Sequence, residues 1–242
     1  MTSEYSWYSI VHWLKKGVEL DRMGLNRTEE DLYDLQHLSV DYQSLIDLGI
    51  RFPFIIKKYN FENVDFTNSA LSDSWLSFCS FKNCIFKNSK IQKSNFTACK
   101  FENCKFIKTD FSYSFLVQNY RYNAGHFKNC LFEECHFKDN DFTFPVIEDC
   151  TFLKCKFNWV NFDGSRFKNT VFIGKLKRVM FKKYSVTAQK TFLELFKIIK
   201  VNKVENMMEN VDMSNAEFGD VDFDKKLNLS KVIFPTNENS SL

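Results

Sequence analysis

Several features that mark common protein classes are missing from this chain of 242 residues. The net charge is only +3, so the chain as a whole is neither acidic nor basic. No stretch of 18 uncharged apolar residues is present, which predicts no membrane-spanning helix. The first residues lack the basic and apolar regions of a secretory signal peptide. We therefore expect a cytoplasmic protein whose eight cysteines are reduced rather than paired in disulfides.

Catalytic motifs are also missing. The chain has no glycine-rich phosphate-binding loop, no Cys-x-x-Cys and no His-Glu-x-x-His. Cys135 and His136 are adjacent, but neighbouring residues of an extended strand point to opposite faces, so they should not act together. The four histidines are scattered: His12, His37, His126 and His136. The sequence therefore predicts neither an enzyme nor a cofactor or metal site.

Phenylalanine, by contrast, is abundant, with 28 residues against seven glycines and three prolines. From Phe61 to Leu116, and again from Phe127 to Phe172, every fifth residue is large and apolar. A helix repeats apolar residues every three or four positions and a strand every two, so neither alone explains a period of five. Self-similarity at a fixed period indicates a solenoid.

The cysteines sharpen this pattern, because all eight lie two residues before one of the large residues. Most other residues at this position are small or compact, such as Ser69, Ser89 and Thr109. Residues two positions apart lie on the same face of an extended segment. Each five-residue unit therefore predicts a short strand that buries one small and one large side chain.

A longer repeat shows how the units stack. A four-residue word, Phe-x-Asn-Cys in its commonest form, begins at Phe61, Phe81, Phe101, Phe127, Ile147 and Phe167. All intervals between these starts are equal to four units, except that the interval from Phe101 to Phe127 is longer by six. Four units therefore form one coil, and six residues are inserted within 116–126. Like residues should then stack on like, about 4.8 Å apart, including a ladder of Asn side chains.

The pattern over residues 61–172 resembles the pentapeptide-repeat family, whose consensus is Ala-(Asp/Asn)-Leu-x-x. Here Cys, Ser or Thr replaces much of the Ala, and Phe replaces most of the Leu. The resemblance implies a mainly β fold, a right-handed quadrilateral β-helix with square coils. The structural core is then predicted to consist of two stacked columns: Phe61, Phe81, Phe101, Phe127, Ile147 and Phe167, with Cys84, Cys104, Cys130 and Cys150. A soft metal in the cysteine column is a weak alternative, because a close-packed core offers no entry path.

The remaining segments should close or interrupt the solenoid. Residues 1–56 are predicted to form a helical N-terminal cap, with one helix around Trp7–Leu14, a second from an N-cap at Thr28 through Leu38, and a third over 41–48. The β-helix itself is expected over 57–172. Residues 173–210 are predicted to be a basic segment with an amphipathic helical insertion over 187–201, residues 211–235 a final partial coil, and 236–242 a disordered tail.

Two features are candidates for function. The insertion breaks a regular wall and carries Tyr120, Arg121 and Tyr122, residue types that are favoured at binding hot spots. Residues 173–203 contain nine Lys or Arg and one acid. The candidate basic patch consists of Lys175, Lys177, Arg178, Lys182, Lys183 and Lys190. Each feature also has a plain structural reading, as a tolerated surface bulge and as a docked surface helix.

A regular column without catalytic groups predicts a non-enzymatic scaffold that binds a protein partner. Well-understood members of the family bind DNA gyrase and topoisomerase IV, mimic duplex DNA and protect against quinolones or topoisomerase poisons, so the resemblance implies a type II topoisomerase as one such partner. Charge speaks against this function, because a DNA mimic should present rows of carboxylates. Acids do gather locally at Glu133, Glu134, Asp139, Asp141, Glu148 and Asp149. Nucleic-acid or membrane binding through the basic 173–203 segment is a third alternative, and a homodimer is a further expectation.

Overall fold

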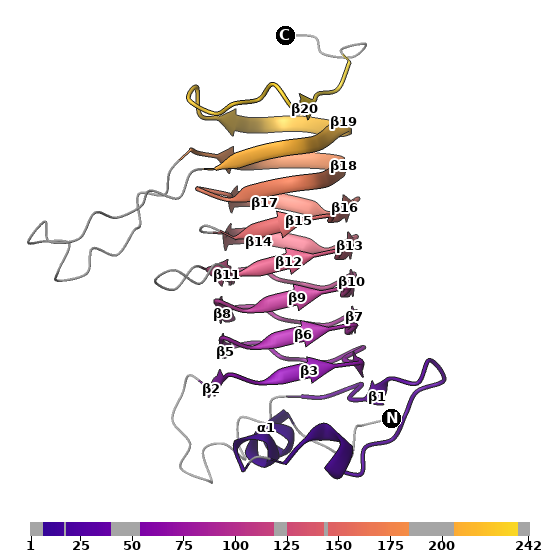
Figure 1. Cartoon of the computed structure of the whole chain (residues 1–242). Coiled ribbons are helices and arrows are strands. Elements are labelled where there is room, and N and C mark those ends of the chain that lie inside the picture. The colour runs from indigo at the N-terminus through magenta and orange to yellow at the C-terminus, as the bar shows by residue number, and fades with distance from the viewer. Residues whose placement is uncertain are drawn as a thin grey trace, which may run out of the picture.

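The computed structural model describes residues 7–16, 18–39, 54–118, 125–142, 145–183 and 206–236. Its strands form one sheet that winds upward in successive coils from the N-terminal to the C-terminal end (Figure 1). Each strand pairs in parallel with the equivalent strand of the next coil, and this pairing continues across the insertion. Four columns of paired backbone result, so each coil has four faces. The predicted quadrilateral β-helix is confirmed.

The strands fall into these four columns. The first face is formed by β3 (Asn60–Glu62), β6 (Ser80–Lys82), β9 (Lys100–Glu102), β12 (His126–Lys128) and β15 (Val146–Glu148). The second face is formed by β1 (Tyr33–Asp34), β4 (Val64–Asp65), β7 (Ile85–Lys87), β10 (Lys105–Ile107), β13 (Leu131–Glu133) and β16 (Thr151–Leu153). The fourth face begins with β2 (Phe54–Lys57), β5 (Ser74–Ser77), β8 (Asn95–Thr97) and β11 (Phe115–Gln118).

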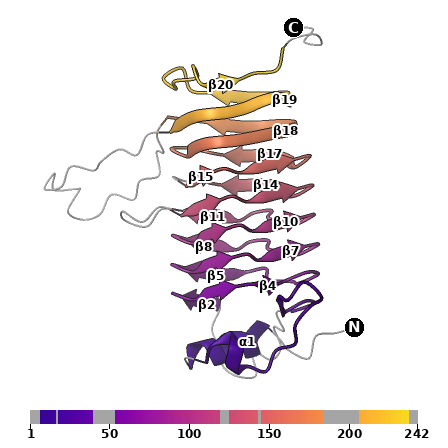
Figure 2. The same cartoon turned by 45° about the vertical axis from the view of Figure 1, so that its right-hand side comes forward.

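The third face is held in the lower coils by single bridges that run Ser39–Ala70–Lys90–Asp110–His136. Above them, β14 (His136–Asp141) and β17 (Lys156–Asn161) turn from the third face into the fourth. The last coils are nearly continuous: β18 (Arg166–Phe181) and β19 (Met207–Phe223) each pass round all four faces, and β20 (Val232–Ile233) pairs with β19. Figure 2 shows these upper strands lying on the shorter ones below.

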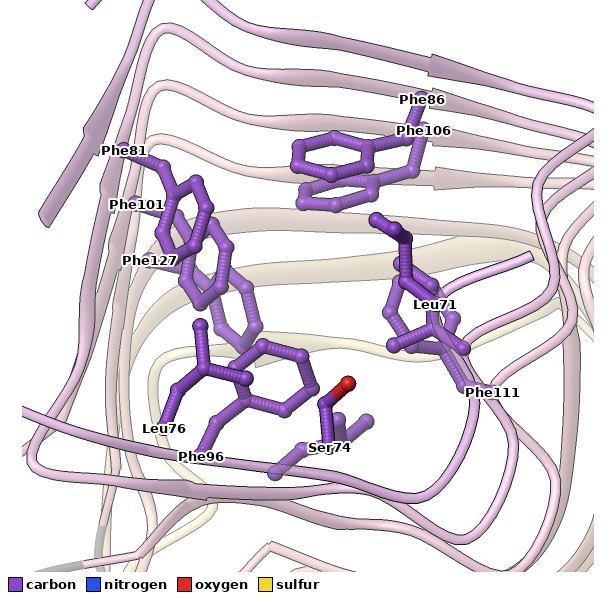
Figure 3. A pocket seen from close by; sticks show the side chains of 12 residues that line it. Leu71, Ser74, Leu76, Phe81, Phe86, Phe96, Phe101, Phe106, Phe111 and Phe127 are labelled. Atoms are coloured by element: carbon purple, nitrogen blue, oxygen red, sulfur yellow. The ribbon is translucent and has the colours of Figure 1, made fainter. Parts of the chain in front are cut away.

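The large residues of the repeat fill the interior as stacked rings. Phe81 stacks on Phe61 and Phe101 with centroids 4.8 and 4.7 Å apart, which is the spacing of neighbouring strands. Phe86 stacks in the same way on Phe106, at 4.9 Å, in the next column. Figure 3 shows both columns pointing toward the axis of the coil. Burial of these rings is the main stabilising contribution, about 1.5–3 kcal/mol for each fully buried side chain.

The small residue of each unit does more than fill space. Ser89 Oγ donates a hydrogen bond to the carbonyl of Phe66, at 2.7 Å, and Ser114 Oγ donates to the carbonyl of Ile91, at 2.8 Å. Cys84 Sγ lies 3.5 Å from the carbonyl of Phe61 in the same arrangement. Ser, Thr and Cys at this position thus give a buried carbonyl a partner, which is favourable, whereas Val64 and Val160 fill the same position without donating.

The corners explain the Asn column. The second residue after each large residue has a positive φ, for example 53° at Asn83, 54° at Asn103 and 52° at Asn129. Among residues other than glycine, Asn and Asp adopt this left-handed conformation most readily. Stacked corners also join their carboxamides, since Asn103 Nδ2 donates to Asn83 Oδ1 at 3.1 Å and Asn129 Nδ2 to Asn103 Oδ1 at 2.8 Å. The predicted ladder is present.

Helix α1 (Trp7–Lys15) lies across the lower end of the stack, and the short helix η1 (Leu20–Arg22) follows it (Figure 1). Ile10 and Leu14 of α1 are buried in the same core as the repeat. The first predicted helix is thus present. The helix predicted over 41–48 lies outside the described residues, as do the one over 187–201 and all but the first residue of the tail predicted over 236–242.

The helix predicted over Thr28–Leu38 is wrong. Thr28 Oγ1 accepts a hydrogen bond from the Leu32 amide in a tight loop, and Tyr33 and Asp34 form β1, which pairs with β4. Leu35 and Leu38 are buried as expected, but inside the first coil. Their spacing of three fits a helix, yet the unpaired edge of β4 offers this segment backbone hydrogen bonds and a buried face instead.

The boundary predicted after residue 172 is also wrong, because β18 continues to Phe181 and its Leu176 and Phe181 are buried. Phe172 and Leu176 are only four residues apart, since the coil loses one residue at Gly174, which has φ 106°. The slip hides the period of five. The next coil begins at Met207 rather than at residue 211. Above it Phe234 packs edge-on against Phe223, 5.6 Å away, and covers part of the upper end.

Candidate interaction surfaces

The first face carries a column of alternating charge. One residue after each large side chain, the chain places Glu62, Lys82, Glu102, Lys128, Glu148, Lys168 and Glu209 directly above one another. Lys82 Nζ lies 3.0 Å from a Glu62 oxygen, and Lys168 Nζ lies 2.9 Å from a Glu148 oxygen. Hydrogen bonding and attraction to Lys168 lower the pKa of Glu148. The positive and negative charges of this column therefore largely cancel one another.

The acids that gather in the sequence do not gather in space. Glu133 and Glu134 lie on the second face and its corner, where Lys108 pairs with Glu134 at 3.7 Å. Asp139 and Asp141 lie on the third and fourth faces, and Glu148 belongs to the first. Within the described ranges, no face presents a row of carboxylates, which weakens the reading of this solenoid as a DNA mimic.

The fourth face carries an exposed apolar column in its lower coils. Ile55 pairs with Trp75, Trp75 with Asn95, and Asn95 with Phe115. The side chains of Ile55, Trp75 and Phe115 point outward and are 39%, 45% and 48% exposed. We call Ile55, Trp75 and Phe115 the aromatic column. A large patch of exposed apolar side chains is a mark of an interaction site.

Both interruptions of the solenoid lie between the end of a fourth-face strand and the start of a first-face strand. Phe101 pairs with Phe81, 20 residues earlier, but with Phe127, 26 residues later. The six extra residues fall between β11 and β12, which confirms an insertion after β11. β18 ends at Phe181 on the fourth face and β19 begins at Met207 on the first, so this longer interruption leaves from the corner between the same two faces. Tyr120, Arg121 and Tyr122 lie outside the described residues, and their role stays a prediction.

The predicted basic patch is divided between two places. Lys175, Lys177 and Arg178 follow one another on the third face, whereas Lys182 and Lys183 lie at the end of the fourth. The amide of Lys183 donates to Asp224 Oδ2 at 3.3 Å. Lys190 lies outside the described residues. The described residues of the predicted basic patch therefore do not form one surface.

Three residues of the predicted basic patch lie beside residues that the sequence analysis did not single out. Lys154 and Lys156 of the preceding coil lie beside Lys175, Lys177 and Arg178, and Trp159 lies among them with 53% of its side chain exposed. We call this set the cationic surface: Lys154, Lys156, Trp159, Lys175, Lys177 and Arg178. The Arg178 guanidinium carbon lies 5.2 Å from the centre of the Trp159 ring, and its Nη1 donates to Asn158 Oδ1 at 3.3 Å.

The interior offers no room for a ligand in the part of the chain that the structure describes. A gap on the axis is lined by the stacked rings and by Ser74, the one polar side chain in it, and encloses only about 10 Å³ (Figure 3). That is at the lower limit for one water molecule. A substrate pocket needs roughly 300–1,000 Å³.

A shallow cleft of about 350 Å³ opens on the second face between the turn at Glu30 and the strands β7 and β10. Asp65 is its buried acid, and both carboxylate oxygens are occupied: Oδ1 accepts from the Thr67 amide at 2.8 Å and Oδ2 from Gln36 Nε2 at 2.9 Å. These two hydrogen bonds join the carboxylate to the first coil and to its own turn, which is a structural role for this acid.

The eight cysteines are all buried and free. Burial raises the pKa of the Cys99 and Cys155 thiols well above the usual value, so these groups stay neutral. Among the described residues, no three or more His, Cys, Asp or Glu side chains come together as a metal site would require. No described helix has the length and apolar character needed to cross a bilayer.

Comparison with known proteins agrees with the coil geometry. The family model of pentapeptide repeats matches residues 60–103, with eight copies of the unit. The solenoid is thus built from pentapeptide repeats. The structure extends the repeat beyond the matched residues, because the same register continues through β13, β16 and β18. No curated protein sequence matches the chain.

Three solved structures of pentapeptide-repeat type illustrate the similarity. QnrB1, a plasmid-mediated fluoroquinolone resistance protein, is 14% identical over 71% of this chain and 90% of its own, with a TM-score of 0.41. HetL, involved in heterocyst differentiation regulation in Nostoc sp. strain PCC 7120, is 11% identical over 84% and 100%, with a TM-score of 0.30. Rfr23 from Cyanothece 51142 is 7% identical over 79% and 96%, with a TM-score of 0.19.

Both exposed surfaces carry a signal that the sequence contains. The residue before each large residue points outward, so an apolar residue there is conspicuous once the coil is assigned. Ile55, Trp75, Asn95 and Phe115 all occupy this position, one in each of four successive coils. Trp159 stands at a corner position that elsewhere often holds Asn or Asp. Neither signal is visible in hydrophobic periodicity alone.

Proposed function

We propose that this pentapeptide-repeat protein is a non-enzymatic scaffold that binds a protein partner through the aromatic column. The observation that supports this is the outward position of Ile55, Trp75 and Phe115 on one rigid face, in a fold that otherwise buries the large residue of nearly every unit. Trp and other aromatic side chains dominate binding energy at protein interfaces. The filled interior favours binding over catalysis.

The effect of the column can be estimated from its exposure. About half of the Trp75 and Phe115 side chains is exposed, and complete burial of such a side chain contributes about 1.5–3 kcal/mol. Covering the exposed halves of both would contribute about 1.5–3 kcal/mol together, or roughly a tenfold to 150-fold change in affinity.

The test compares the intact chain with the double variant Trp75→Thr, Phe115→Thr. The immobilised proteins are used to capture partners, and each captured protein is then purified and titrated against both. A partner that loses at least tenfold in affinity for the double variant, while Trp159→Asn on the other surface leaves it unchanged, supports the proposal. Equal affinity of every purified partner for both proteins contradicts it.

A type II topoisomerase is the specific partner that the family suggests. It is tested with a gyrase supercoiling assay, with and without a quinolone, on the intact chain, the double variant and Arg121→Ala. Inhibition or rescue that weakens in either variant supports a topoisomerase as the partner. No effect at micromolar protein leaves the scaffold with a different partner. A homodimer is tested separately by the molar mass in solution.

A further inference from the structure

We propose that the cationic surface on the third face binds single-stranded nucleic acid, with Trp159 stacked on a base and the surrounding lysines against the phosphates. This narrows the nucleic-acid alternative from the basic 173–203 segment to six residues of two coils. It is independent of the protein partner of the aromatic column, because the two surfaces lie on different faces of the solenoid.

Cations outnumber acids on and around this surface. On the first face each of the three lysines of the column lies between two glutamates, and Lys82 and Lys168 form ion pairs. Among the described residues, the five cations of the cationic surface form no ion pair with any acid. Glu134 and Asp139 in the coil below, and Glu217 and Asp220 in the coil above, lie one strand away, with Glu217 directly opposite Lys175, but none of them forms an ion pair with these cations. Like charges on neighbouring strands are destabilising, and an anionic ligand would relieve this.

Trp159 adds a second, independent observation. It occupies a corner with φ 59°, a conformation that is unfavourable for a bulky side chain and that Asn adopts at the corners of the ladder. Trp159 is 53% exposed, and the Arg178 guanidinium lies over its ring. The conformation itself belongs to the coil, since Phe78 and Tyr113 also adopt it. What Trp159 adds is a large exposed aromatic face among several cations, which is available to a ligand.

A ring beside several cations suits a ligand that has both negative charge and flat aromatic faces. Single-stranded nucleic acid has both, and positively charged surfaces with exposed aromatic side chains are how proteins bind it without sequence preference. In a duplex the base faces are stacked on one another, and the grooves admit a helix or a two-stranded ribbon rather than the flat side of a solenoid. Acidic polypeptides would engage the lysines but leave the ring without a stacking partner.

The experiment measures the fluorescence anisotropy of a labelled oligothymidylate of about 20 nucleotides, which exceeds the 4–16 nucleotides that such surfaces occupy. If about four cations contact phosphates, the logarithm of affinity falls with slope near −2.8 against the logarithm of salt concentration. Affinity then falls roughly 50-fold between 50 and 200 mM salt. Three substitutions, Lys156→Gln, Lys175→Gln and Lys177→Gln, made together should reduce the slope to about −0.7.

A matched control removes the same charge elsewhere. Lys82→Gln, Lys128→Gln and Lys168→Gln on the first face change the net charge equally and should leave binding and its salt slope unchanged. Trp159→Asn should weaken binding about fivefold to 150-fold, the equivalent of about 1–3 kcal/mol for one stacked base, without lowering the melting temperature. Trp159→Phe keeps a ring and should retain most of the affinity.

Several outcomes would overturn the proposal. These are no binding at 50 mM salt, equal losses in the two triple variants, or no effect of Trp159→Asn. Duplex DNA of the same length, poly-glutamate and vesicles of anionic phospholipid are tested in parallel. Tighter binding to any of them than to the oligothymidylate rejects single-stranded nucleic acid and points to that ligand class instead.

Discussion

Phe101 provides the sharpest test of the coil structure. Its side chain is 3% exposed and stacks between Phe81 and Phe127, with centroids 4.7 and 4.9 Å away. It also meets the edges of Phe96, at 5.6 Å, and Phe106, at 5.7 Å. Phe101→Ala therefore removes a buried ring and four aromatic contacts at once.

Such substitutions typically destabilise by about 3–5 kcal/mol. We expect the upper part of this range, because the coils above and below are hydrogen-bonded in register and cannot collapse into the space. In a domain of this size each kcal/mol lowers the melting temperature by roughly 2–4 °C, so a loss of about 4–5 kcal/mol should shift it by about 8–20 °C. Lys100→Ala, one residue earlier and outward, should change stability by less than about 0.5 kcal/mol.

The two variants are compared with the intact protein by urea and thermal unfolding, followed by far-ultraviolet circular dichroism. Phe101→Leu serves as a control that keeps the apolar volume but loses the ring contacts, and it should fall between the other two. If Phe101→Ala and Lys100→Ala shift the unfolding midpoint equally, the ring does not lie in the core and the coil assignment is wrong.

Three further predictions concern the backbone at Gly174, the protonation of His126 and the eight buried thiols. Gly174→Ala should destabilise by about 1–3 kcal/mol, because its φ is +106° and the new Cβ would lie 3.2 Å from Lys154 Cα, whereas the uncrowded Gly24→Ala should cost less in the same melting experiment. Burial lowers the pKa of His126 below its usual value near 6.5, despite the Glu148 carboxylate 3.8 Å away, so the unfolded chain takes up this proton first. Stability should therefore fall as pH drops below 6.5, and His126→Gln should flatten that part of the curve of unfolding free energy against pH. The eight buried thiols should not react with Ellman's reagent in the native protein and should all react in guanidinium chloride; fast native labelling would show that the core opens.

The period of five and its echo from coil to coil were sufficient to predict the solenoid, its core and its stacking ladder. They were sufficient because each position of the unit has a fixed environment: inward large, inward small, or corner. The hydrogen bonds of the small residues were not predictable in this way. Ser89 and Cys84 reach carbonyls 23 residues away, and only the closed coil brings those groups together.

The errors have two causes: a regular unit whose buried residues happen to stand three apart, and a coil that departs from five residues per side. Leu32, Leu35 and Leu38 are three apart and look helical, but the first coil uses Leu35 and Leu38 as interior residues. Gly174 shortens one side by a residue, which ended the visible period too early. The exposed surfaces were missed for a different reason: outward positions accept many residue types, so an unusual one is noticed only after the faces are known.

The alternating charges of the first face have a consequence for how this chain can grow or misfold. Glu and Lys exchange at every coil, so the true repeat of that column is two coils rather than one. A duplication, deletion or slip of a single coil would set two like charges on neighbouring strands, which is unfavourable. A change of two coils would preserve every opposite pair. Lengthening by pairs of coils is thus the path that this column tolerates.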